Sequence, residues 1–119
     1  MVRAVRGAIT VEQNDKDEIL NAAEELLKEI FAKNGIPAED MVCMVFTLTP
    51  DLNAVFPAVA ARRMGITNVP LMCMSEIPVE DALPKCVRVL LQFNSEKTLD
   101  EIQHVYLRDA VKLRPDLVK

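Results

Sequence analysis

The sequence predicts an α/β (α+β) domain in which a mixed sheet of about five strands packs against one long amphipathic helix. Five short stretches are rich in β-branched or other apolar residues, which is typical of strands. One longer segment carries apolar residues at helical spacing. The 119 residues, half of them hydrophobic, suffice for one core of ordinary size. We therefore expect residues 1–119 to form a single domain.

The first two elements are a strand at Val2–Val11 and the major helix. Alternation along the strand places Arg6 on the face opposite Arg3. The segment Asp15–Glu18 resembles a capping box and puts acids at the positive end of the helix, and Asn34–Gly35 ends it. Between these ends, the apolar positions that follow the i, i+3, i+4 and i+7 pattern are Ile19, Ala22, Ala23, Leu26, Leu27, Ile30 and Phe31.

The middle of the chain predicts two further strands and a short helix. Met41–Leu48 is a nearly continuous apolar run, as expected of a central strand that is covered on both faces. Phe56–Pro57 predicts the start of a short helix, because proline is tolerated in a first helical turn. Gly65 predicts the end of this helix. Val69–Met74 predicts the third strand.

The last third of the chain predicts the remaining strands. Cys86–Phe93 is the fourth strand and carries Arg88 among apolar residues. Thr98–Glu101 has the pattern of a capped helical turn, and Val105–Leu107 predicts a fifth strand. We expect Asp109–Lys119 to be a mobile tail that packs weakly, because it is short, mixed in charge and broken by a proline.

Composition excludes several classes of partner. The net charge is −4 and lysines and arginines form no run, which argues against nucleic acid or an anionic bilayer. Charges interrupt every window long enough to span a membrane, and no leader precedes the first strand. We expect a cytoplasmic protein. Three cysteines without a CxxC pair support neither a disulfide framework nor a zinc site.

Familiar reaction machinery is also missing. The sequence has no GxSxG, GxxxxGK[ST], GxGxxG or HExxH motif, and three glycines leave little with which to build a phosphate-binding loop. His104 is the only histidine and has no obvious nucleophile beside it. Cys73 lies among apolar residues and fits a small core residue better than a nucleophile. We predict no metal and no cofactor.

Two arginines in predicted strands are the most informative residues. Arg6 and Arg88 keep their charge, so burial requires a negative partner. That partner is either an acidic ligand or a side chain such as Glu76 or Asp51 in a structural network. If it is a ligand, fixed cations and hydrogen-bond donors such as Tyr106 suit a reaction that needs no proton transfer and no covalent intermediate.

Several stretches of the sequence favour an acidic ligand as the partner of these arginines. VRGAITVE at 5–12, TPDLNAVFPA at 49–58, HVYL at 104–107 and AVKLRPDL at 110–117 resemble the monofunctional chorismate mutases of the Bacillus type. The similarity covers essentially the whole chain, and the motifs occur in the family's order. The resemblance implies a homotrimer with a pseudo-α/β-barrel fold and active sites in clefts between subunits. It also implies an isomerase of phenylalanine and tyrosine biosynthesis that converts chorismate to prephenate by a Claisen rearrangement, without a cofactor.

The resemblance assigns roles to individual residues. Arg6 would bind a substrate carboxylate, Arg88 would face the ether oxygen that gains negative charge, and Glu76 would accept a hydrogen bond from the substrate hydroxyl. Only an interaction that strengthens toward the transition state, as at Arg88, raises the catalytic rate. The other positions that the resemblance places at the substrate are Met72, Cys73, Met74, Ser75, Tyr106, Phe56, Ala58, Arg62, Leu113 and Arg114.

This chain departs from some relatives, and two other functions compete. Val59 stands where a lysine can occur beside the site, and Met72 replaces a small polar residue. One alternative is a non-catalytic trimeric module that binds a small carboxylate metabolite. The other is a trimeric imine deaminase, which the quoted motifs disfavour.

Overall fold

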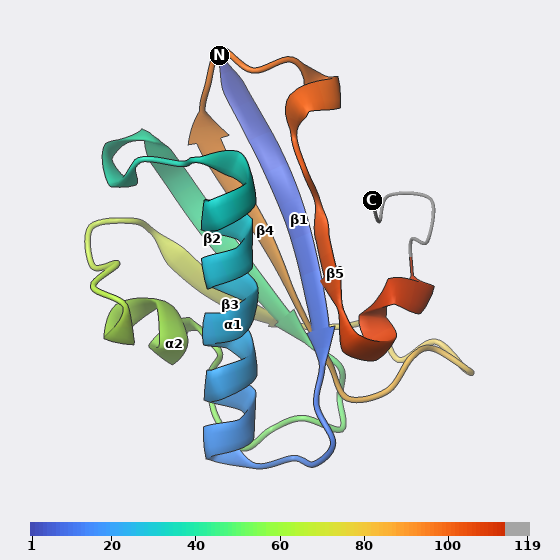
Figure 1. Cartoon of the computed structure of the whole chain (residues 1–119). Helices are drawn as coiled ribbons and strands as arrows, with labels where there is room; N and C mark the ends of the chain where they lie inside the picture. The colour runs from blue at the N-terminus through green and yellow to red at the C-terminus, as the bar shows by residue number, and fades with distance from the viewer. Residues whose placement is uncertain (114–119) are drawn as a thin grey trace.

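The computed structural model describes residues 1–113, which form one sheet and the helices packed on it (Figure 1). Among these residues, no helix is long and apolar enough to span a membrane. Short 3-10 helices lie at 38–40, 99–101 and 108–112. The strands and α-helices are β1 (Val2–Thr10), α1 (Lys16–Asn34), β2 (Met41–Leu48), α2 (Ala58–Arg63), β3 (Leu71–Ser75), β4 (Cys86–Asn94) and β5 (Val105–Leu107).

The sheet is mixed, as the sequence predicts, and its strand order is β3-β2-β4-β1-β5. Strand β4 is antiparallel to both β1 and β2, whereas β1 with β5 and β2 with β3 are parallel pairs. The middle strand is therefore β4, and β2 is an interior strand that lies between β3 and β4. The expectation that β2 is covered on both faces was wrong: Cys43, Val45 and Thr47 are only half-buried, because α1 packs against the other face of the sheet.

Helix α1 crosses one face of the sheet, and both of its predicted ends are confirmed (Figure 1). The Asp15 side chain accepts a hydrogen bond of 3.0 Å from the backbone N–H of Glu18. Gly35 adopts φ 59°, and its N–H donates to the carbonyl of Phe31 at 2.9 Å. The Glu18 carboxylate reaches past the cap to the N–H groups of Glu12 and Gln13, and so ties the β1–α1 connection to the helix.

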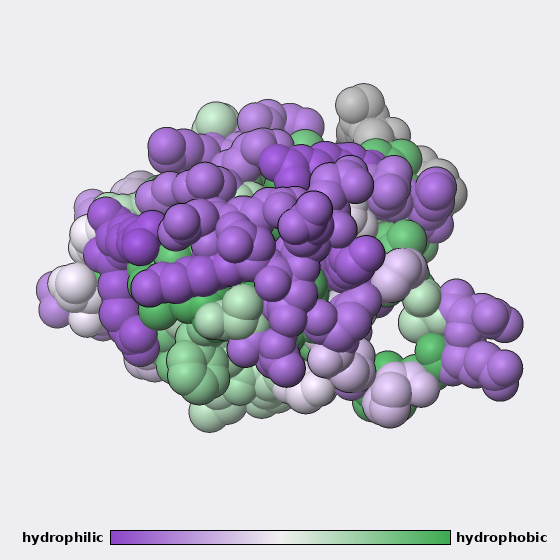
Figure 2. Space-filling view, turned by 90° about the horizontal axis from the view of Figure 1, so that it is seen from below, coloured by the Kyte–Doolittle hydropathy of each residue, from purple (hydrophilic) through white to green (hydrophobic). Residues whose placement is uncertain are grey.

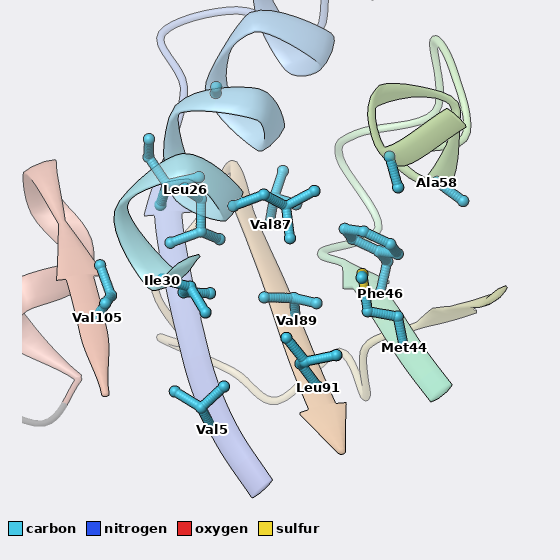
Figure 3. Close-up of a cluster of buried hydrophobic side chains, with 14 of the residues drawn as sticks. Val5, Leu26, Ile30, Met44, Phe46, Ala58, Val87, Val89, Leu91 and Val105 are labelled. Atoms are coloured by element: carbon cyan, nitrogen blue, oxygen red, sulfur yellow. The ribbon is translucent and has the colours of Figure 1, made fainter. Parts of the chain in front are cut away.

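The core fills the space between α1, α2 and the sheet (Figure 3). Gly7 lets α1 approach β1 closely, since a Cβ atom at this position would lie 2.7 Å from Ile30 Cδ1 and 3.0 Å from Leu26 Cδ1. Aliphatic side chains and the rings of Phe46 and Phe93 close the layer, as expected of a chain poor in aromatic residues. The largest fully buried side chains are Phe46, Phe93, Ile9, Ile19, Leu20, Leu26, Leu27, Ile30, Met44, Leu91, Val5 and Val87.

The start of the predicted tail is packed. Residues 108–112 form a 3-10 helix in which Ala110 is completely buried. Arg108 adopts φ 55° and donates to the carbonyl of Thr10 at 3.0 Å, and the Asp109 N–H donates to Thr10 Oγ1 at 3.1 Å. The expectation of weak packing from Asp109 onward was therefore wrong for 109–113, because these contacts anchor the segment to β1. The rest of the predicted tail lies outside the described residues.

Candidate active site

One row of side chains crosses the sheet on the face opposite α1. Strand register places Met74 beside Thr47, Thr47 beside Arg88, Arg88 beside Ala8, and Ala8 beside Tyr106. Side chains alternate along strands, so all five project from the same face. We call this side of the sheet the open face. Its residues are Ala4, Arg6, Ala8, Cys43, Val45, Thr47, Met72, Met74, Cys86, Arg88, Leu90, Gln92 and Tyr106. The small Ala8 leaves space between Arg88 and Tyr106.

A hollow of about 380 Å³ lies over this row. It brings together six of the residues that the sequence predicts at the substrate, from four strands and the loop after β3. Two of these are cations and one is an acid. The lining residues are Arg6, Gly7, Val45, Thr47, Met74, Ser75, Glu76, Ile77, Arg88, Val89, Leu90 and Tyr106.

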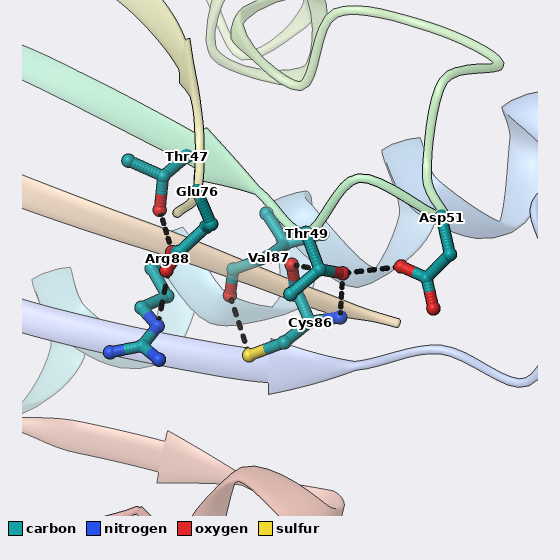
Figure 4. A network of polar contacts seen from close by, with 7 residues as sticks. All are labelled: Thr47, Thr49, Asp51, Glu76, Cys86, Val87 and Arg88. Carbon is teal, nitrogen blue, oxygen red and sulfur yellow. Dashed lines mark hydrogen bonds and ion pairs between the residues drawn. The ribbon is translucent and has the colours of Figure 1, made fainter. Parts of the chain in front are cut away.

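Among the described residues, Arg88 contacts an acid through only one of its nitrogens. Its buried Nε lies 3.1 Å from Glu76 Oε2, which is within ion-pair distance, but the N–H is not aligned for a hydrogen bond. Figure 4 shows the two terminal nitrogens pointing away from Glu76. The Arg88 side chain is 43% exposed and that of Glu76 is 18% exposed. Arg88 Nε thus has a side-chain acid as its partner, as the alternative of a structural network predicts. The guanidinium nevertheless lines the hollow and can meet a ligand.

Asp51, the other acid considered as a partner for arginine, has a different role. Its carboxylate accepts hydrogen bonds from the Lys85 N–H at 3.0 and 3.2 Å and from the Thr49 hydroxyl at 2.6 Å. Thr49 Oγ1 in turn accepts the Cys86 N–H at 3.0 Å (Figure 4). This clamp joins the end of β2 to the start of β4, two residues before Arg88. It also supports Lys85 at a φ of 51°.

Cys86 begins β4 beneath this clamp and is fully buried. Burial raises the pKa of its thiol from 9.0 to about 11; the nearby Arg88 charge acts in the opposite direction, and Glu76 in the same direction. The thiol contacts a cluster that includes Ala8, Tyr106 and Ala110. Cys86 is therefore a protonated packing residue and not a nucleophile.

Arg6 lies beside the row on β1, and Tyr106 ends the row on β5. Arg6 lies in β1 but is exposed, and its side chain makes no ion pair or hydrogen bond with any described residue, so no described acid is its negative partner. Its backbone N–H donates to His104 Nδ1 at 3.0 Å. Tyr106 is only 7% exposed, and its neighbours hold its ring in the wall of the hollow.

The other residues that the sequence predicts at the substrate are not among those that line this hollow. Phe56 and Cys73 line a second hollow of about 660 Å³, which shares Met74 and Ser75 with the first. Arg62 lines a third hollow, of about 210 Å³. Ala58 is buried in the core beside α1, and Met72 is exposed on the open face. Leu113 packs against the cluster that contains Tyr106, and Arg114 lies outside the described residues.

Sequence reasoning missed Thr47 as a site residue. It is the one hydroxyl in the apolar run that forms β2, and its Oγ1 donates a hydrogen bond to Glu76 Oε2. A polar residue interrupting a predicted buried strand was an available signal. Among residues 1–113, no group of three or more His, Cys, Asp or Glu side chains could hold a metal ion.

Comparison with known proteins identifies the family of this chain. The family model described as chorismate mutase type I matches residues 2–117. The chain belongs to the type I chorismate mutase family. It is thus an isomerase of aromatic amino acid biosynthesis, which converts chorismate to prephenate.

Individual chorismate mutases match almost end to end. Chorismate mutase AroH of Thermus thermophilus is 48% identical over 118 residues, which are 98% of this chain and 97% of that protein. AroH of Bacillus subtilis is 46% identical over 118 residues, or 98% and 93% of the two chains. The solved structure of a chorismate mutase from Clostridium thermocellum superposes with a TM-score of 0.89 at 49% identity, and covers 91% of this chain and 96% of that one. The predicted family and fold class are confirmed.

Proposed function

We propose that this chorismate mutase isomerises its substrate in the hollow over the Arg88 row. The rearrangement is unimolecular: one carbon–oxygen bond breaks while one carbon–carbon bond forms, and no proton or group is exchanged. The observation that carries the proposal is the environment of Arg88, whose Nε is held beside Glu76 while the guanidinium lines the hollow. A cation fixed in this way costs no reorganisation when charge develops beside it.

The six residues of the hollow that the sequence predicts at the substrate have roles that their environments support. Arg88 faces the ether oxygen, which gains electron density as its bond to carbon breaks. Arg6 is exposed and binds a carboxylate of the dianionic substrate, since no described residue neutralises it. Glu76 accepts a hydrogen bond from the substrate hydroxyl, and Tyr106 donates its phenol to the carboxylate. Met74 and Ser75 form the wall from which Glu76 follows.

We propose that the complete site lies between subunits of a homotrimer. Phe56, Ala58 and Arg62 are placed at the substrate by family resemblance, yet within one chain they lie in other hollows or in the core. A neighbouring subunit could bring Phe56 and Arg62 to the hollow. The open face supports this, because Met72 and Leu90 are exposed there and association would bury them.

The loop at 76–85 is a second feature that supports association. In Figure 2 a lobe stands out from the body at the right, in the position of the loop that extends to the lower right in Figure 1. Ile77 and Val79 are among the most exposed large apolar residues, at 79% and 64%. Apolar side chains on a projecting loop are stabilised when a second subunit covers them.

The remaining assignments concern the C-terminal segment and the cell compartment. Leu113 packs beside Tyr106, so we propose that it helps to close the hollow. Arg114, which the family resemblance places at the substrate, lies outside the described residues. We place the enzyme in the cytoplasm. Its three cysteines, all free, suit a reducing compartment.

Turnover by the purified protein tests the function directly. Chorismate absorbance should fall while prephenate appears in equal amount, with no added metal or cofactor. Protein that is folded and trimeric but gives no prephenate would contradict the proposal and leave the binding module as the better interpretation.

Mixed trimers test the shared site. Chains carrying Arg88→Gln and chains carrying Arg62→Ala are each expected to form impaired homotrimers. Trimers refolded from equal amounts of both should regain about one quarter of the wild-type activity, since chance combines an intact Arg88 with a neighbour's intact Arg62 in that fraction of clefts. If both residues act within one chain, mixing will restore nothing above the average of the two variants.

A further inference from the structure

Thr47 connects the two residues that define the proposed site. Its hydroxyl donates a hydrogen bond to Glu76 Oε2, the same oxygen that lies 3.1 Å from Arg88 Nε (Figure 4). Thr47 and Arg88 are direct partners in the β2–β4 register, whereas Glu76 reaches them from beyond the end of β3. All three side chains line the hollow.

We propose that Thr47 is a positioning residue for the isomerisation. It holds the Glu76 carboxylate on the Nε side of Arg88 and so keeps the outer part of the guanidinium available to the substrate. This inference rests on the proposed location of the reaction, and adds a residue to which neither the sequence nor the family resemblance assigns a role.

The position of Glu76 in the chain explains why its carboxylate needs a partner. Its backbone N–H donates to the carbonyl of Leu48 at 2.8 Å, which extends the β2–β3 pairing by one residue. The chain then leaves the sheet into the loop at 76–85, where Ile77 is exposed and Asp81 adopts φ 65°. A glutamate side chain at such a junction retains rotamer freedom unless a hydrogen bond restricts it.

The alternative arrangement of the same charges would be harmful. Arginine and carboxylate groups favour a two-point contact in which both carboxylate oxygens meet two guanidinium N–H groups. If Glu76 made that contact with the terminal nitrogens of Arg88, it would cover the cation that the substrate needs. The bond from Thr47 occupies Oε2 and fixes the carboxylate at Nε, while Oε1 has no hydrogen-bond partner among the described residues.

Substitutions at position 47 test the role of the hydroxyl. Thr47→Val keeps the branched shape on the strand and removes the donor, whereas Thr47→Ser keeps the donor. We expect Thr47→Val to lower kcat/KM about tenfold, the scale of one hydrogen bond to a charged group, and Thr47→Ser to retain most of the wild-type value. Thermal unfolding should show that both variants are folded.

A double-substitution cycle tests whether Thr47 acts through Glu76. In a Glu76→Gln background, Thr47→Val should have little further effect on kcat/KM, because the carboxylate that it positions is already gone. An equal loss in both backgrounds would overturn the proposal. So would wild-type activity in Thr47→Val, or a folded Thr47→Ser that loses as much as Thr47→Val.

The same measurements separate this inference from the location of the site. If Arg88→Gln and Glu76→Gln both retain full turnover, the reaction does not occur in this hollow, and the role of Thr47 falls with it. If those two variants lose activity while Thr47→Val does not, the site stands and the positioning role of Thr47 is refuted.

Discussion

The two faces of the sheet are made by the same strands but have different environments. Under α1, β4 contributes Val87, Val89 and Leu91, which are at most 2% exposed. On the open face the same strand contributes Arg88, whose side chain is 43% exposed, and Leu90. Consecutive residues of one strand thus contribute to the core and to the proposed site in turn, since side chains alternate between faces.

This difference teaches that stability and catalysis can be altered independently along β4. A substitution under α1 should change the free energy of unfolding and leave the chemistry of folded protein intact. A substitution one residue away, on the open face, should do the reverse. Variants on both faces, and probes of residues at the boundary, can sharpen or break this division.

The largest expected effect is on catalysis, at Arg88. Arg88→Gln should lower kcat about 10²–10³-fold, as loss of one preorganised group that stabilises developing charge does. KM should change much less, and the midpoint of thermal unfolding only slightly, because the side chain is partly exposed. Steady-state kinetics and a thermal melt measure these quantities. A variant that loses substrate affinity while kcat is unchanged would favour a binding role for Arg88 over a catalytic one.

Leu91→Ala is the matched change on the covered face. Leu91 is fully buried, and removal of a buried leucine side chain should lower the free energy of unfolding by about 3 kcal/mol. Urea unfolding measures this loss. In conditions where the variant is folded, its kcat should stay within about twofold of wild type, since the separation of the faces keeps the cavity away from the hollow. A large fall in kcat for folded protein would show that the two faces are coupled.

Cys86 tests where the open face ends. Although its side chain projects from that face, the segment after β5 covers it. A pKa of about 11 instead of 9.0 lowers the thiolate fraction at pH 8 about hundredfold, so alkylation of Cys86 should be at least that much slower than in the unfolded chain. Peptide mapping after brief alkylation should find Cys43 and Cys73 modified first.

The same thiol predicts a direction for stability against pH. Between pH 9 and 11 the unfolded chain releases this proton and the folded chain keeps it, so the contribution of Cys86 favours unfolding as the pH rises. Cys86→Ser should weaken this fall in stability. Rapid labelling of Cys86 in native protein would instead show that 108–113 does not close this end of the face.

Most of the fold could be predicted, because its signals are local. The period of α1, its cap at Asp15 and its end at Gly35 are all visible within a few residues. Strand order could not be predicted, since the central position of β4 depends on pairing with β1 and β2, which are distant in sequence. The packing of 109–113 was missed for a similar reason: its partner, Thr10, lies at the other end of the chain.

The site could be predicted only in part. Arg88, Glu76, Arg6 and Tyr106 were identified by charge in apolar strands and by family resemblance, and they share one hollow. Thr47 was missed because its role depends on register opposite Arg88. No single-chain pattern could place Phe56 or Arg62 beside these residues, since in the arrangement that we propose they come from a neighbouring subunit.

The smallest expected effect is at Gly7, where β1 passes directly under α1. Gly7→Ala introduces a Cβ that would lie 2.7 Å from Ile30 Cδ1, so this flexible end of a side chain must move. Crowding of this kind costs about 1–3 kcal/mol, and the loss of glycine freedom in the unfolded chain offsets about 0.4–1 kcal/mol of it. We expect a net destabilisation of about 1 kcal/mol in urea unfolding, with kcat unchanged.

A second substitution shows whether the helix contact is the cause. Ile30→Val removes the Cδ1 atom that the new methyl group would meet, and alone should cost about 1 kcal/mol. In the double variant Gly7→Ala/Ile30→Val the two losses of unfolding free energy should not add, because Ile30→Val frees the space that the new methyl group at position 7 fills. Full additivity would mean that Gly7 matters through its backbone and not through the approach of α1. A fall in kcat in the double variant would break the separation of the faces from the covered side.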